Sequence, residues 1–286
     1  MKKAKIKINT VYIIVFILFG AYALSICYTF LWGVVAGLME DNNVFILHPF
    51  EVPSKFVFKN YVQAFTMVKS GKTSMLGMLF NSVWYTVGAT VLSVACSTTM
   101  AYVVNKYKFF GRNILFYISL VVMILPIVGS LPAQFRLVKN MGIDNSPLLL
   151  LMFCSGFGFN FIVMYGFFSN VSWSYAEAGF IDGASDFQVF FNIILPQAVP
   201  SVLSLMILAA IGFWNDYQTP LMYLNKLPPL SVGLQDFNLN IGYSLLPNSY
   251  PLLFAGVMLS IVPILIVFVV CQDTIMNNTV AGGLKG

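Results

Sequence analysis

Apolar residues in this chain gather into six long stretches that contain no Asp, Glu, Lys or Arg. A helix that crosses a bilayer needs roughly 20 apolar residues, and each stretch can hold one. A helix is expected because lipid cannot satisfy an open backbone, and the alternation of a lipid-exposed β-strand is absent from the sequence. The pattern predicts an all-α membrane protein with six transmembrane helices. The predicted spans are 11–38, 76–104, 114–136, 147–168, 200–222 and 251–272.

The overall composition supports this interpretation. Charged residues make up 9% of the chain and hydrophobic residues 59%, and the mean hydropathy is +0.84. A soluble protein of 286 residues could not cover its surface with so few charges. The sequence leaves no room for a separate soluble domain, so we expect a short tail at 1–10 followed by one six-span membrane domain at 11–286.

The basic N-terminal tail bears on orientation. The apolar run from Val11 to Leu38 is too long for a cleaved signal peptide, so we expect an uncleaved first span. Lys and Arg divide eight to seven between the two sides, but the lysine-rich tail and the tight basic loop at 105–113 favour an inside N-terminus. Six spans then place both termini in the cytoplasm.

Metal and cofactor chemistry is not expected. Cys27, Cys96, Cys154 and Cys271 lie in apolar stretches without the spacing of metal ligands, which is typical of core residues. His48 lies beside Pro49 in the polar segment 39–75. We therefore predict no metal site and no cofactor.

The longest loop expected on the inner side, 169–199, carries signals for two short helices. Ser174 and Glu177 are spaced as a capping box, which predicts a helix beginning at Tyr175 with Trp173 as its preceding hydrophobic staple. Gly183 is placed for a left-handed helix end.

A second capping box, Ser185 with Gln188, predicts a second helix that stops before Pro196, and Pro200 would lie in the first turn of the next span. We call residues 174–196 the hook. Its apolar Ile193 and Leu195 would pack beneath the spans, and its tip consists of small residues. A docking element and an ordinary amphipathic connector on the membrane surface are both compatible with this pattern.

The order of Glu177, Ala178, Gly183 and then Ile193, Leu195 and Pro196 resembles the EAA motif of ABC-importer permeases. Gly179 stands where that motif usually has alanine, a departure that would loosen the first helix. The stretch 178–185 looks like the sugar-importer subgroup, whose members often read A-x-I-D-G-A-S.

Further segments resemble the MalG-like permeases of that subgroup, in order and over nearly all of 60–286. One departure is Ser231, which stands where those permeases have proline. The matching segments are 81–82, 101–102, 109–113, 214–216 with 220–221, 230–234 and 281–286.

This resemblance implies a machine of several subunits in the cell (inner) membrane. A related second permease would complete the pathway through the lipid bilayer, two ATP-binding cassette ATPase subunits would hydrolyse ATP, and an extracytoplasmic sugar-binding protein would deliver the substrate, with no role for nucleic acid. The chain has no G-x-x-x-x-G-K-[ST] loop, so it is expected not to be an enzyme itself. The residues expected to couple to the ATPase from a cytoplasmic loop are Glu177, Ala178, Gly179, Asp182, Gly183, Ala184, Ser185, Leu195 and Pro196.

A sugar pathway needs flat apolar rings and hydrogen-bonding groups. Taken singly, each such residue more commonly serves as an aromatic at the membrane interface or as a contact between helices. The candidates within the predicted spans are Asn81, Trp84, Tyr85, Asn160, Trp214 and Asn215.

Three other functions compete with sugar import. An importer for another small solute is the nearest alternative. A channel or secondary carrier usually needs ionisable relays inside its spans, and here Asp216 is the only such group well inside a span, near its outer end, where it could instead fasten span five. An intramembrane enzyme is disfavoured because the spans hold no paired Asp, no H-E-x-x-H and no Ser/His pair.

Overall fold

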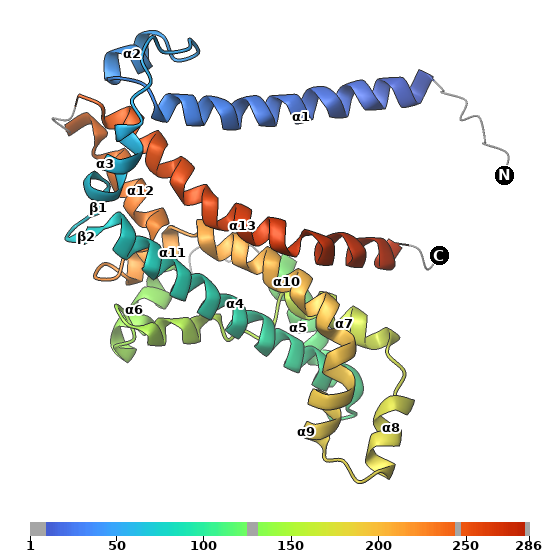
Figure 1. Cartoon of the computed structure of the whole chain (residues 1–286). Coiled ribbons are helices and arrows are strands. Elements are labelled where there is room, and N and C mark those ends of the chain that lie inside the picture. Colours follow the sequence, from blue (N-terminus) through green and yellow to red (C-terminus); the bar gives the residue numbers. More distant parts are fainter. Residues whose placement is uncertain (1–9, 125–130, 244–246, 284–286) are drawn as a thin grey trace. The chain divides into compact units, whose positions relative to one another are not determined.

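A computed structural model of the chain describes residues 10–124, 131–243 and 247–283, with side chains up to Gln272 (Figure 1). The described ranges are predominantly helical, as predicted, and include one small hairpin of strands β1, Lys69–Ser70, and β2, Thr73–Ser74. The chain folds as two compact units, one of residues 1–69 with 236–261 and one of residues 70–235 with 262–286.

The first unit is organised around Asn60, which is fully buried. Its amide donates to the carbonyls of Gly37 (3.1 Å) and Met39 (2.8 Å), and its carbonyl accepts from Asn248 (2.8 Å). A buried amide satisfied on both sides stabilises the helix ends that meet there. The helical elements of this unit are α1 Thr10–Gly37, α2 Asn42–Leu47, α3 Lys59–Met67, η3 Ile241–Tyr243 and the first part of α13 Ser249–Gly283.

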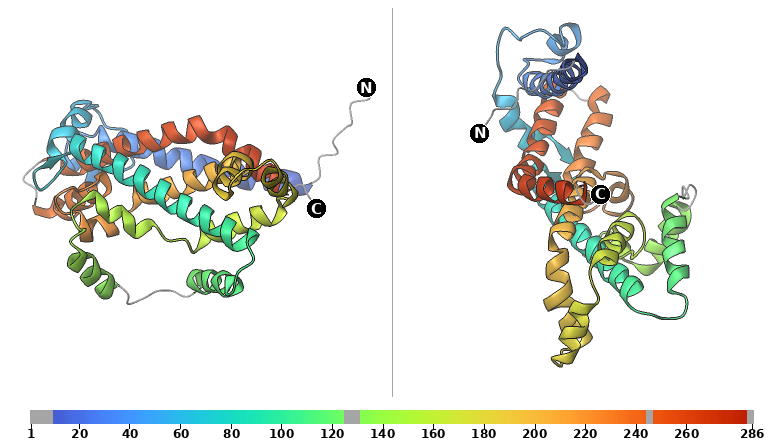
Figure 2. Two further views of the ribbon diagram at one scale, coloured as in Figure 1. Left: turned by 90° about the horizontal axis from the view of Figure 1, so that it is seen from below. Right: turned by 90° about the vertical axis from the view of Figure 1, so that its right-hand side faces the viewer.

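The second unit is built around α4, Met75–Lys106, which packs against α7, Phe159–Asn170, and α10, Leu195–Asn215. Helices α4 and α10 lie side by side and run in opposite directions (Figure 2). The other elements are α5 Arg112–Ile124, α6 Leu131–Met141, η1 Pro147–Phe153, α8 Ser174–Ile181, α9 Asp186–Gln188, η2 Val189–Ile194, α11 Gln218–Tyr223 and the first part of α12 Leu230–Leu239.

Four helical stretches of the described chain are long and apolar enough to cross a membrane: Thr10–Gly37, Met75–Lys106, Asp186–Asn215 and Ser249–Gln272. The first two lie within two residues of the first and second predicted spans, and Ser249 lies two residues before the predicted start of the sixth, whose helix α13 continues to Gly283. The fifth span was predicted at 200–222 and is shifted, because the helix begins well before Pro200 and ends at Asn215.

Of the third predicted span, 114–136, the structure describes the part in α5, up to Ile124, and the part in α6, from Leu131; Pro126 lies outside the described residues. The fourth predicted span is not a single helix. Within 147–168, the 3₁₀ helix η1 ends at Phe153 and α7 begins only at Phe159.

Close packing explains the irregular segment between η1 and α7. A Cβ at Gly156 would lie 3.1 Å from the Met100 side chain, and Gly158 has a φ of +108°. Ser97 also donates to the carbonyl of Ser155 (3.1 Å). Glycine at position 156 lets the backbone approach α4 closely, and glycine at position 158 permits a backbone conformation that other residues rarely adopt.

Candidate functional site

The first helix of the hook ends as the sequence predicts but begins differently. Gly183 has a φ of +84°, and its N–H donates to Phe180 (3.0 Å) while Ala184 donates to Gly179 (2.9 Å). This pair of bonds is the Schellman arrangement for closing a helix. The predicted first capping box is wrong, because α8 already begins at Ser174, and that hydroxyl pairs with Ser172 (2.7 Å).

The second capping box is confirmed. The Ser185 N–H donates to Gln188 Oε1 (2.8 Å), and the Gln188 N–H donates to Ser185 Oγ (3.4 Å). The predicted stop before Pro196 is wrong, because α9 passes through the π-helix η2 into α10 without interruption. In this wider turn the Leu195 N–H donates five residues back, to Phe190. Pro196 therefore lies inside a continuous helix, directly after the wider turn of η2.

Gly179 is a packing requirement of the hook. It is buried in α8, and a Cβ there would lie 2.6 Å from Ile193 Cδ1 and 3.1 Å from Val189 Cγ2. The sequence led us to expect that glycine would loosen this helix, but the missing Cβ instead permits this close contact. Without a Cβ, α8 approaches η2 closely, and the two arms of the hook lie side by side (Figure 1).

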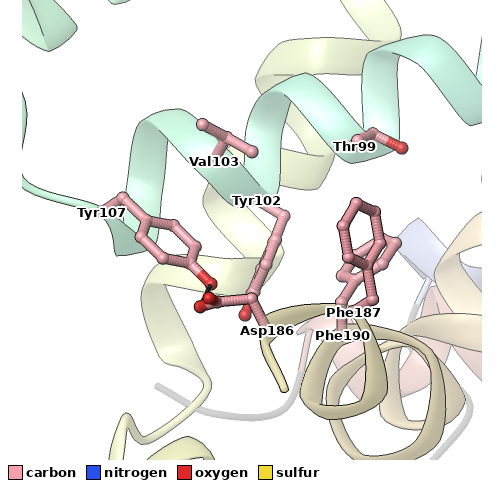
Figure 3. Close-up of a pocket in the computed structure, with 7 residues that line it drawn as sticks. All are labelled: Thr99, Tyr102, Val103, Tyr107, Asp186, Phe187 and Phe190. Carbon is pink, nitrogen blue, oxygen red and sulfur yellow. Dashed lines mark hydrogen bonds between the residues drawn. The ribbon is translucent and has the colours of Figure 1, made fainter.

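A hydrogen bond that the sequence did not predict ties the hook to α4. The Tyr107 hydroxyl donates to Asp186 Oδ1 (2.6 Å), beside a cavity of about 250 Å³ lined by Tyr102, Phe187 and Phe190 among others (Figure 3). Burial, and then this bond, raise the pKa of Tyr107 above its ordinary value. A tyrosine between two lysines at a span end gives no sequence signal for this role.

Hydrophobic contacts hold the base of the hook against the helices of the second unit. Val189 and Ile194 are fully buried, and Ile193 and Leu195 pack against the same cluster, as predicted. The tip is different: Ile181 is 85% exposed and Phe187 is 77% exposed. Ile181 therefore lies largely uncovered beside the glycine corner, whereas Phe187, although exposed, also lines the cavity beside Tyr107 (Figure 3).

Three pathway candidates lie near the start of α4, and their polar groups bond within the protein. The Asn81 amide donates to the carbonyl of Pro228 (3.0 Å), and Trp84 Nε1 donates to Asn81 Oδ1 (3.2 Å). Tyr85 is 1% exposed and donates to Asp216 Oδ2 (2.8 Å). Asn81 and Tyr85 therefore join elements that are distant in sequence.

The remaining candidates separate onto different surfaces of α10 and α7. The exposed Asn215 amide donates to Ile211 of its own helix (2.8 Å). Trp214 lines an almost wholly apolar cavity of about 390 Å³ with Thr86 and Thr90. Asn160 lines a different cavity, of about 440 Å³, which also contains Asp216.

Asp216 fastens the end of α10, as one interpretation of the sequence proposed. Its carboxylate accepts from Tyr85 (2.8 Å) and from the N–H of Thr219 (3.1 Å), and its carbonyl accepts from Ser231 (2.8 Å). Three bonds to α4, α11 and α12 give this residue a structural role that a mobile proton relay would not have.

Within the described ranges, no three His, Cys, Asp or Glu side chains come together as a metal site would require. The four cysteines are free.

Comparison with known proteins identifies the class of protein. Residues 89–278 match the family described as "Binding-protein-dependent transport system inner membrane component". The diacetylchitobiose uptake system permease protein NgcG of Streptomyces coelicolor is 28% identical over 89% of this chain and 83% of its own length. The galactooligosaccharides transport system permease protein GanQ of Bacillus subtilis is 27% identical over 95% of this chain and 94% of its own.

The fold is also found in a solved structure. A chain of a bacterial ABC transporter involved in the import of the acidic polysaccharide alginate superposes with a TM-score of 0.76, covering 91% of this chain and 95% of that one at 24% identity. The family match covers most of the sequence, and the fold agrees with it. This chain therefore belongs to the binding-protein-dependent inner-membrane permeases of ABC transport systems.

Proposed function

We propose that the chain forms half of the transmembrane pathway for a sugar or oligosaccharide, and that its hook receives the force of ATP hydrolysis from an ATPase subunit. The relatives named above are permeases for diacetylchitobiose and galactooligosaccharides, which favours a sugar over another small solute. Members of this family are transport components and not enzymes, so the chemistry of ATP belongs to partner subunits.

One observation carries the docking proposal. The base of the hook is buried, while Ile181 and Phe187 at its tip are 85% and 77% exposed. A rigid projection with exposed apolar anchors around a tight glycine corner fits a groove on a partner. The proposed coupling residues are those of the two arms and the corner, from Glu177 to Pro196.

The accompanying topology is also a proposal. A tail at 1–10 and a membrane domain at 11–286 with six spans would place both termini and the hook in the cytoplasm. The third span would include α5 and α6, and the fourth would consist of η1 and α7. Cysteine substitutions at Lys72 and Ile181, both exposed, test this in a cysteine-free chain. An impermeant thiol reagent added outside should label Lys72→Cys and not Ile181→Cys; the reverse would refute this topology.

The complete importer would contain a related second permease, two ATPases and an extracytoplasmic binding protein. Vesicles holding this chain alone should take up no sugar, and the full assembly should import sugar only with ATP on the hook side. Sugar uptake by the lone chain down a gradient would instead favour a channel or carrier.

The hook itself is tested by Gly183→Val. A β-branched residue at a left-handed position costs about 1–2 kcal/mol, so the corner should open and docking should fail. We expect the assembly to hydrolyse ATP without importing sugar. Gly142→Val is the matched control, because Gly142 has a φ of +64° and equally open surroundings but lies after α6. Normal uptake by Gly183→Val would remove the docking proposal.

A further inference from the structure

The cavity that contains Asn160 has the size and chemistry of a small-molecule site. Its volume of about 440 Å³ lies in the range of roughly 300–1,000 Å³ found for such sites. It is formed entirely within the second unit, by Ser93 of α4, Phe159 and Asn160 of α7, and Gly212, Phe213 and Asp216 at the end of α10.

The groups lining this cavity match the two faces of a sugar ring. Phe159 is 54% exposed, and Phe213 is held edge-on against Phe153 (4.7 Å between ring centroids). Polar groups come from Ser93 and Asn160. The Asn160 amide donates to the Ser93 hydroxyl at 3.4 Å. This is a long bond, and the pair together offers hydroxyl and amide groups that can both donate and accept. Apolar ring faces beside paired donors and acceptors suit a polyhydroxylated ring.

The two cavities on opposite faces of α10 differ in the polar groups that they contain. The cavity beside Trp214 is almost wholly apolar, and its polar contributors Thr86 and Thr90 are buried. The other cavity is also largely apolar but contains Asn160 and Asp216. Amide and carboxylate groups facing lipid are strongly disfavoured, so these two residues must face protein or a water-filled path. The cavity that contains them is therefore the better candidate for a place on the substrate route.

Charge limits which sugar this cavity can accept. Both carboxylate oxygens of Asp216 accept hydrogen bonds, from Tyr85 and from the backbone of Thr219. No Lys or Arg lines the cavity, and the sequence holds none at 75–105, 159–170 or 195–215. Like charges repel, so a second carboxylate would be repelled by Asp216 and would find no counter-charge here.

We propose that this cavity is a binding site for an uncharged sugar ring, held by Asn160 and Ser93 against the phenyl rings, and that Asp216 excludes sugar acids. This inference rests on the proposed function as a sugar permease. By this inference the substrate of this chain differs in charge from the acidic polysaccharide that the transporter of the same fold imports.

The first experiment distinguishes failure of this inference from failure of the proposed function. The complete assembly in vesicles is offered two panels with ATP on the hook side: neutral diacetylchitobiose, galactobiose and arabinobiose, and anionic digalacturonate and dimannuronate. We expect uptake only from the neutral panel. Uptake of the anionic sugars alone overturns the inference and leaves a sugar importer, whereas no uptake from either panel overturns the proposed function and the inference with it.

The second experiment locates the site. Asn160→Leu removes the amide, and we expect the KM for the imported neutral sugar to rise roughly 2- to 10-fold, the range of one ordinary hydrogen bond. Asn170→Leu is the control on the same helix, because that exposed amide donates to Gly166 of α7 itself. An unchanged KM in Asn160→Leu overturns the site.

A third experiment separates charge from structure at Asp216. Asp216→Asn removes the negative charge, and Tyr85→Phe removes the hydrogen bond between the two residues while keeping the charge. In an assembly with Gly212→Cys as the only cysteine of this chain, the reporter lies on the wall of the cavity at a position where an added Cβ meets nothing within 4 Å. The imported neutral sugar should slow labelling of this cysteine by a small thiol reagent, and digalacturonate should not. Digalacturonate should slow labelling only after Asp216→Asn is added. Slowed labelling by digalacturonate in the Tyr85→Phe background, or no effect of the neutral sugar, overturns the proposal.

Discussion

Two tyrosine–aspartate hydrogen bonds join α4 to the α10 segment, one at each end, and they differ in burial. Tyr85 is 1% exposed and donates to Asp216, which also accepts from Thr219. Tyr107 donates to Asp186, an exposed residue at the start of α9. The same pair of residue types therefore serves a buried junction at one end and a solvent-accessible attachment of the hook at the other.

The difference in burial indicates that the two junctions contribute differently to stability. A buried hydroxyl that loses its acceptor has no water to replace it, whereas an exposed pair exchanges partners with water at little cost. We therefore expect the Tyr85–Asp216 junction to contribute mainly to stability, and the Tyr107–Asp186 junction mainly to the orientation of the hook.

The largest effect should follow from Asp216→Ala. This change leaves the Tyr85 hydroxyl and the Thr219 N–H without their acceptor, so we expect a loss of about 2–3 kcal/mol in the free energy of unfolding. Chemical denaturation of the purified chain in detergent measures it. Asp216→Asn retains a carbonyl acceptor and should lose less; equal losses in the two variants would contradict this account.

Asp186→Ala should cost less than about 1 kcal/mol in the same unfolding measurement, because the lost bond is exposed. Its effect should appear in coupling instead, as less sugar imported per ATP hydrolysed by the complete assembly. A stability loss as large as that of Asp216→Ala would remove the distinction between the two ends.

Gly179→Ala tests the packing between the arms of the hook. The added Cβ would meet Ile193 Cδ1 at 2.6 Å, and we expect a loss of about 1 kcal/mol, reduced because alanine favours the helix. The double variant Gly179→Ala with Ile193→Val removes the clashing methyl and should recover stability. If the single variant is more stable than the wild type, the contact is not tight.

The smallest effect concerns alkaline pH. Because the pKa of Tyr107 is raised above 10.0 in the folded chain, the unfolded chain loses this proton first as pH rises. The stabilisation is fully present below about pH 10 and is lost as the pH rises from there towards the folded-state pKa. Thermal unfolding at about pH 9 and about pH 11 should show a slightly smaller alkaline loss in Tyr107→Phe than in the wild type. An identical loss in both would show that Tyr107 does not contribute.

The class of protein and the local structure of the hook could largely be predicted from the sequence. Charge-free apolar stretches indicate helices because lipid admits little else. The left-handed glycine at 183 and the Ser185–Gln188 box were predictable because both depend on residues within one helical turn. The same local reasoning failed at Ser174 and Pro196, where one hydroxyl has a competing partner and a π-turn accommodates the proline.

The roles of residues that contact distant parts of the chain could not be predicted in this way. Gly179 packs against Ile193, Tyr107 bonds to Asp186, and Tyr85 bonds to a carboxylate 131 residues further along the chain. The fold also separates the pathway candidates, with Asn160 beside Ser93 and Asp216 in one cavity and Trp214 in an almost wholly apolar one. The physical reason is that helix formation depends on neighbours in sequence, whereas a cavity or a buried hydrogen bond depends on which helix faces pack together, and a periodic apolar pattern does not encode that pairing.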